Sequence, residues 1–111
     1  METTTVWVTT QFEGFHSWGN APEEVKFLRD NHRHIFKVKV TLEVKHDDRE
    51  VEFFIFKKQL EGFIQDSFKS ENVGSCEMIA NIIKGYVKLV YPGRKVSVEV
   101  SEDGENGACV T

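Results

Sequence analysis

The sequence predicts an α+β domain in which helices cover one face of a four-stranded antiparallel sheet. Three observations predict this fold: segments in which apolar and polar residues alternate, two long segments with helical spacing, and their order along the chain. That order is strand, strand, strand, helix, helix, strand. The chain has 111 residues, enough for one hydrophobic core but not for two, so we assign residues 1–111 to a single domain.

Alternating residues predict two strands near the start of the chain, because successive side chains of a strand point to opposite faces. The first covers residues 5–12, and a loop that contains Gly14 follows it. The second begins at His32 and has the most regular pattern in the sequence. The residues on its apolar face are His32, His34, Phe36, Val38, Val40, Leu42 and Val44. Lysine and threonine side chains occupy the other face, as expected for a half-buried strand.

Two shorter segments complete the predicted sheet. Val51 and Phe53 predict a third strand, with residues 46–49 as the tip of a hairpin. Residues 96–100 alternate and predict the fourth strand. Turn signals follow this strand, so residues 108–110 are expected to form only a short tail.

Helical spacing predicts two helices between the third and fourth strands. Apolar residues recur at this spacing over residues 56–68 and again over residues 78–90. Ser75 is the predicted N-cap of the second helix, since its hydroxyl can accept a hydrogen bond from an unpaired main-chain N–H. A short helical turn is also expected at residues 23–29.

Composition argues against several classes of protein. The net charge is -4, with 14 lysines and arginines against 18 acidic residues, which disfavours a protein that binds nucleic-acid backbones. No apolar run approaches the length of a membrane span, and the N-terminal residues have neither the basic nor the apolar part of a signal peptide. We therefore expect a cytoplasmic protein without nucleic-acid or membrane partners, in which Cys76 and Cys109 are free thiols.

Three of the 4 histidines are candidate metal ligands. His32 and His34 lie at the head of the second strand with one residue between them, so both imidazoles share one face. His16 has the parity of the apolar face of the first strand, provided that the strand extends that far. Three histidines that leave a coordination position open are typical of catalytic zinc sites, because water or substrate takes that position. A chance cluster of polar residues at the mouth of a strand is the alternative that spacing leaves open.

Five segments, in order along the chain, carry a family resemblance. They read Phe-Glu-Gly-Phe-His at residues 12–16, His-Arg-His-Ile-Phe-Lys-Val at 32–38, Val-Glu-Phe-Phe-Ile-Phe-Lys at 51–57, Gly-Ser-Cys-Glu-Met-Ile-Ala at 74–80 and Val-Glu-Val-Ser-Glu at 98–102. They are similar to Phe-x-x-x-His, His-Gly-His-x-Tyr-x-Val, Val-Asp-Phe-x-x-Leu-Lys, Pro-Thr-Ser-Glu-x-x-Ala and Val-x-Val-x-Glu. These are motifs of the 6-pyruvoyltetrahydropterin synthase and 6-carboxytetrahydropterin synthase family, and the resemblance covers most of the chain.

The resemblance implies the tunnelling fold (T-fold), in which subunits assemble into barrels, and therefore a homo-oligomer. It also implies a zinc ion as cofactor. The zinc ligands that it implies are His16, His32 and His34. It assigns Glu102 to the amino-pyrimidine edge of a pterin, because a carboxylate can accept two parallel hydrogen bonds. Ser75 and Cys76 match a segment assigned to ligand binding, whereas a solvated acid in a terminal turn is the alternative for Glu102.

The sequence departs from the family pattern at its acid/base positions. The family has a catalytic cysteine four residues before the first histidine of the pair, where this chain has Leu28. The family's Asp-His pair is also missing, because residues 64–72 contain no histidine. Cys76 and Asp30 are the candidate catalytic replacements: a thiol near a helix N-terminus often has a lowered pKa, and an acid beside the histidine pair could orient a ligand or act as a base. A small buried side chain and a turn acid are their respective alternatives.

Two functions of different classes follow from these observations. The first is a zinc-dependent lyase of the pterin-synthase type, with altered or weak activity on a dihydropterin or a related purine-like compound. The second is a non-catalytic module that binds such a ligand, and a structural oligomer with a vestigial site is a weaker third. The missing thiol and Asp-His pair favour the module, whereas the reactivity of an open three-histidine zinc site favours the lyase.

Overall fold

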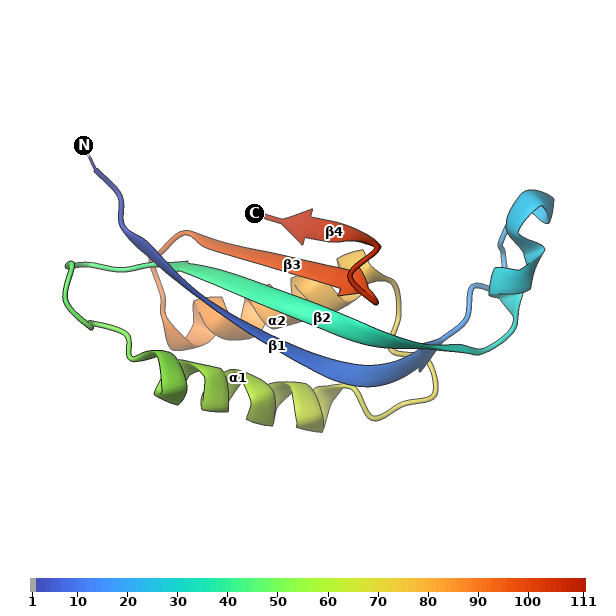
Figure 1. The fold of residues 1–111 in the computed structure, drawn as a ribbon, viewed down its shortest axis with the longest axis horizontal. Coiled ribbons are helices and arrows are strands. Elements are labelled where there is room, and N and C mark those ends of the chain that lie inside the picture. The colour runs from blue at the N-terminus through green and yellow to red at the C-terminus, as the bar shows by residue number, and fades with distance from the viewer. Residues whose placement is uncertain (1) are drawn as a thin grey trace.

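The computed structural model describes residues 2–111, which form one four-stranded antiparallel sheet and a layer of two α-helices (Figure 1). The elements are β1 (Thr5–His16), the 3-10 helix η1 (Glu23–Arg29), β2 (His32–Glu43), α1 (Phe53–Ser67), α2 (Cys76–Val90), β3 (Val96–Glu102) and β4 (Asn106–Val110). Neighbouring strands are antiparallel and follow the order β1-β2-β3-β4. The predicted α+β class is confirmed.

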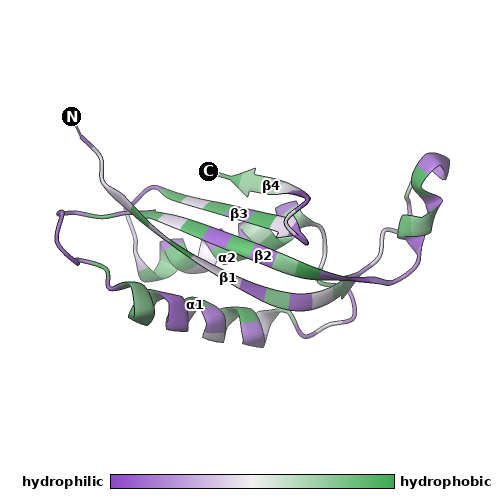
Figure 2. Ribbon diagram, in the orientation of Figure 1, coloured by the Kyte–Doolittle hydropathy of each residue, from purple (hydrophilic) through white to green (hydrophobic). Residues whose placement is uncertain are grey.

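The hydrophobic core lies between the helices and one face of the sheet. Phe36, Val38 and Val40 of β2 have at most 1% of their surface exposed, while Lys37 and Lys39 lie on the exposed face. Figure 2 shows the resulting alternation of apolar and polar positions along the strands. The helices supply the opposing layer through residues three or four positions apart. These are Phe56, Leu60 and Ile64 of α1, and Cys76, Ile79, Ala80, Ile83 and Val87 of α2.

β1 is longer than predicted. It pairs with β2 along its whole length and ends with His16 opposite His32. The loop predicted at Gly14 is therefore wrong, because this glycine lies inside the strand. A Cβ atom at this position would lie 3.0 Å from Cε2 of Phe36, so glycine allows the Phe36 ring to approach the strand closely. That ring then packs against His16, with 5.3 Å between the two ring centroids.

The third strand predicted from Val51 and Phe53 is wrong. Phe53 is the first residue of α1, and the Glu52 carboxylate caps this helix. It accepts hydrogen bonds from the main-chain N–H groups of Phe54 and Ile55 at 2.8 and 3.3 Å. The same carboxylate lies at the positive end of the helix dipole. Two alternating apolar residues do not distinguish a strand from a helix start, and here the cap favours the helix.

The fourth strand of the sheet is β4, where the sequence predicted only a tail. Residues 103–105 join it to β3, with Asp103 at φ 58° and Gly104 at φ 76°. Positive φ at both central residues is typical of the type I′ hairpin turn that Asp-Gly favours. The Glu105 N–H closes the turn by donating to the Glu102 carbonyl at 3.0 Å. Because Glu102 lies opposite Phe36 in the pairing of β2 with β3, this turn lies near the histidine end of the sheet.

Residues 17–31 connect β1 to β2 and extend beyond the histidine end of the sheet (Figure 1). They include the helical turn η1, which the sequence predicted over the same residues. The Trp18 N–H donates to the Leu28 carbonyl at 2.7 Å and closes the base of this connection. Within residues 2–111, no helix combines the length and apolar character that crossing a membrane requires.

Candidate metal centre

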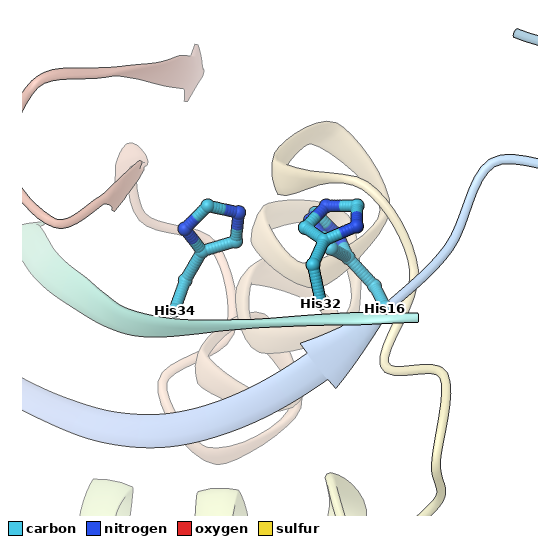
Figure 3. Close-up of side chains that lie close together, drawn as sticks. All are labelled: His16, His32 and His34. Atoms are coloured by element: carbon cyan, nitrogen blue, oxygen red, sulfur yellow. The ribbon is translucent and has the colours of Figure 1, made fainter. Parts of the chain in front are cut away.

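Three histidines come together where β1 ends and β2 begins (Figure 3). His16 and His32 are directly opposite each other in the strand pairing, and His34 follows on the same face of β2. One ring nitrogen from each lies within 4.8 Å of the other two. The structure therefore brings together the three residues that the sequence selected, because parity and register on two paired strands direct all three imidazoles to one side.

Each histidine has its Nδ1 atom within hydrogen-bond distance of an oxygen acceptor. The pairs are His16 with the Gly74 carbonyl at 2.8 Å, His32 with the Asp30 carbonyl at 2.8 Å and His34 with the Asp103 carboxylate at 2.7 Å. Carbonyl and carboxylate oxygens only accept, so Nδ1 carries the proton in each ring. In the neutral ring the other nitrogen, Nε2, then has a free lone pair, which is the arrangement that metal-binding histidines adopt.

The surroundings of His34 fit a bound cation. Its Nε2 atom is buried and has no hydrogen-bond partner among residues 2–111. A buried polar atom without a partner costs about 1–3 kcal/mol, which coordination to a metal would offset. Three neutral imidazoles are also the donor set of zinc sites that keep one position open. The residues present therefore fit zinc.

Gly74 directs its carbonyl oxygen toward His16 through an unusual backbone conformation. Its φ is 93°, in a region that residues with side chains rarely adopt. A Cβ atom at this position would also lie 3.0 Å from Sδ of Met78. The N–H of the preceding residue, Val73, donates to the Phe15 carbonyl at 2.9 Å and attaches the segment to β1. Glycine at this position thus supports a histidine 58 positions earlier in the chain.

Asp103 orients His34 and is a contributing residue that the sequence did not reveal. One carboxylate oxygen accepts from His34 Nδ1, and the other accepts from the Ile35 N–H at 2.9 Å. Both hydrogen bonds lower the pKa of Asp103 below its usual value, and the bond from His34 has the larger effect. The Asp-Gly pair predicted a turn correctly, but nothing in that signal indicates contact with a histidine 69 positions away.

Replacing Asp103 with asparagine is expected to weaken zinc binding about tenfold, the lower end of the range for residues that orient metal ligands. Asparagine tolerates the left-handed turn and can still accept from Nδ1, but it removes the negative charge beside His34. Competition with a zinc-binding dye measures the change. Asp48→Asn, at an exposed turn, is the matched control and should leave the affinity unchanged. Equal affinities for the two variants would contradict the orienting role.

Glu102 ends β3 on the same face as Val96, Val98 and Val100. Its Oε2 atom lies 3.2 Å from Nε2 of His16 and 3.8 Å from Nε2 of His34. Its other oxygen, Oε1, accepts from the Asn106 side chain at 2.9 Å. The residue expected to bind the ligand therefore lies directly against the histidine cluster, and both of its oxygens have partners there.

A pocket of ≈ 630 Å³ opens beside this cluster. Its size is within the range of small-molecule sites. The sequence-selected residues in its lining are His16, His32, Leu28, Ser75, Cys76 and Glu102. Leu28, which stands where the family has its cysteine, thus presents an aliphatic side chain to the same space. Trp18 and Met78 also line the pocket, and each has about half of its surface exposed.

Ser75 and Cys76 lie at the start of α2, where they were expected. Ser75 is the N-cap, since its hydroxyl oxygen accepts from the Met78 N–H at 3.2 Å. Cys76 is buried in the core, as in the alternative of a small buried side chain, and its pKa is not lowered by the helix N-terminus. Burial, followed by the charges of Glu102 and Glu77, raises the pKa of the Cys76 thiol to about 11. At neutral pH this cysteine is a neutral thiol rather than a nucleophile or a base.

Asp30 contacts the cluster through its main chain. Its carbonyl oxygen is the atom that accepts from His32 Nδ1, and its side chain is exposed. The main-chain carbonyl of Asp30 thus orients His32, and any amino acid at this position would supply that group. A catalytic role of the Asp30 carboxylate stays a prediction. The neighbouring acid Glu13 forms an ion pair with Arg33 at 2.7 Å on the opposite face of the sheet.

No protein-family model and no curated protein matches the chain. Fold class alone does not identify an activity, because one architecture supports many unrelated functions. The tunnelling fold and the pterin ligand thus stay expectations from the five sequence motifs. The site itself supplies the independent support for a metal: three convergent imidazoles, each oriented through Nδ1, beside a pocket.

Proposed function

We propose that this chain is a zinc-binding protein that holds a small planar heterocycle, a dihydropterin or a related purine-like compound, beside its metal. One observation carries the proposal: three histidines offer ring nitrogens within 4.8 Å of one another, and two of them, His16 and His32, line a ≈ 630 Å³ pocket. His16, His32 and His34 would hold the zinc. When bound, zinc acts as a Lewis acid that polarises a ligand oxygen.

The pocket wall suits a flat, partly aromatic ligand. Trp18 and Met78 expose apolar surface to the pocket. The indole of Trp18 and the thioether of Met78 both make favourable contacts with aromatic rings. His16, His32 and Glu102 form the polar end of the pocket. A heterocycle with an oxygen-bearing substituent would match both ends, and this is the chemistry that the family resemblance implies.

The proposed chemistry is a weak or altered lyase reaction of the pterin-synthase type, and the alternative is a non-catalytic binding module. Two observations favour the module. Leu28 lines the pocket at the position of the family's thiol and cannot transfer a proton. The nearby Cys76 thiol has its pKa raised to about 11, so it does not replace that group at neutral pH.

Calorimetric titration of the zinc-loaded protein with neopterin and with guanine tests the ligand class. We expect at least one of them to bind, and binding to weaken in protein stripped of zinc by a chelator. Adenine is the control, because it lacks the ring carbonyl and adjacent N–H of guanine and pterins. Failure of both neopterin and guanine to bind the zinc-loaded chain would refute the proposed ligand class while leaving the metal centre intact.

We also propose a symmetric homo-oligomer, as the resemblance implies. β1 and β4 are the edge strands of the sheet, and unpaired strand edges readily accept strands from another chain. Pairing between copies would remove both edges. Light scattering at micromolar concentration should give a mass several times the 12.8 kDa of one chain. A monomeric mass would contradict the proposed assembly.

A further inference from the structure

We propose that Glu102 is a direct ligand of the metal in the ligand-free protein, so that the centre is built from three histidines and one carboxylate. This inference rests on the metal centre proposed above. It gives Glu102 a different role from the ligand-anchoring one that the family resemblance implies. Oε2 faces the histidines, whereas Oε1 accepts from Asn106.

The facing atoms at this position are all electron-pair donors. His16 and His34 each donate through Nδ1, so their Nε2 atoms present lone pairs. Oε2 of Glu102 lies 3.2 Å from one of these atoms and 3.8 Å from the other. Lone pairs repel at such distances unless a cation lies between them. A proton bridges only one nitrogen to the carboxylate, whereas a divalent metal binds both nitrogens and the oxygen together.

The spacing also matches coordination. Zinc bonds to nitrogen and oxygen of about 2.0–2.2 Å at tetrahedral angles put neighbouring ligand atoms about 3.3 Å apart. The separation from His16 is close to this value and that from His34 is slightly wider. The side chains of His16 and Glu102 are partly shielded from solvent, with 11% and 26% of their surface exposed. A carboxylate also neutralises one of the two metal charges, which three neutral imidazoles leave uncompensated.

Strand register holds Glu102 in place. Its position on β3 opposite Phe36 of β2 puts it beside His34, on the helix-facing side of the sheet. Asn106, the first residue of β4 and the pairing partner of Glu102, holds the second oxygen. The carboxylate is therefore oriented before any metal binds, which lowers the entropic cost of recruiting it as a ligand.

The test compares zinc affinity, by competition with a chelating dye, and the visible spectrum of the cobalt-substituted protein. Glu102→Gln removes the charge at nearly constant shape, and Glu102→Asp keeps the charge but withdraws the oxygens by one methylene. Glu99→Gln is the matched control, since Glu99 lies on the same strand but on the exposed face, opposite Lys39. Circular dichroism of each metal-free variant establishes that it is folded.

We expect both Glu102 variants to lose about a hundredfold or more in zinc affinity, because a direct ligand should contribute at least as much as the outer-sphere residues whose loss costs about 10–100-fold. Their cobalt spectra should change in band position and intensity, because these report the geometry of the coordination sphere. Glu99→Gln should match the wild-type protein in both measurements. Wild-type affinity and an unchanged cobalt spectrum in Glu102→Gln would overturn the assignment. Loss in Glu102→Gln but not in Glu102→Asp would reduce Glu102 to a nearby charge and also overturn it. Absence of zinc and cobalt uptake by the wild-type chain would instead refute the metal centre itself.

Discussion

Replacing His34 with alanine is expected to remove the bound zinc. The reconstituted wild-type protein should contain about one zinc per chain. A zinc site contributes roughly 10–16 kcal/mol of binding free energy, so one of three or four ligands carries about 3–4 kcal/mol. Its loss lowers the affinity about a hundred- to a thousandfold. The substitution also removes the imidazole N–H that donates a hydrogen bond to the Asp103 carboxylate. Elemental analysis after dialysis against a weak chelator measures the effect.

The fourth histidine supplies the control for this experiment. His46 lies in an exposed turn away from the cluster, so His46→Ala should retain the zinc of the wild-type chain. His32→Ala should lose the metal as His34→Ala does, because both histidines lie in the same cluster. Retention of one zinc per chain by both cluster variants would show that the metal binds elsewhere. A wild-type protein that takes up no zinc at all would contradict the site more directly.

Turnover of dihydroneopterin triphosphate should be a hundred- to ten-thousandfold slower than in a family member that has the cysteine and the Asp-His pair. The estimate is the roughly 10²–10⁴-fold contribution of a positioned acid/base group. Leu28 cannot supply a proton, and Cys76 is a neutral thiol with a pKa raised to about 11. A single-turnover assay by liquid chromatography, with both proteins zinc-loaded at equal concentration, measures the difference.

Zinc-stripped protein sets the background for this assay, because any rate that it shows does not depend on the metal. Turnover comparable to that of the intact family member would mean that another residue moves the proton. Asp30→Asn and Cys76→Ser would then identify it, since Asp30 and Cys76 are the two candidates that the sequence suggested. Unchanged rates in both variants would exclude both candidates.

Local periodicity was enough to predict several elements of the fold. Alternation along β2 predicted which residues are buried, and it placed His32 and His34 on one face. Helical spacing located both α-helices, and Ser75 was recognisable as a cap from its position before an apolar helix. These features follow from side-chain direction within a single element, and a period of two or of 3.6 residues sets that direction whatever the rest of the chain does.

Contacts between distant segments could not be predicted from local patterns. The sequence predicted a strand at Phe53 and a tail at residues 108–110, but capping by Glu52 and pairing with β3 reversed both assignments. Gly74 and Asp103 orient histidines 58 and 69 positions away, and no local pattern reports such separations. Burial, a property of the packed molecule, raised the pKa of a thiol whose position in a helix suggested the opposite. Local sequence sets the direction of each side chain. Strand register determines which residues that side chain contacts, and desolvation determines the direction of its pKa shift.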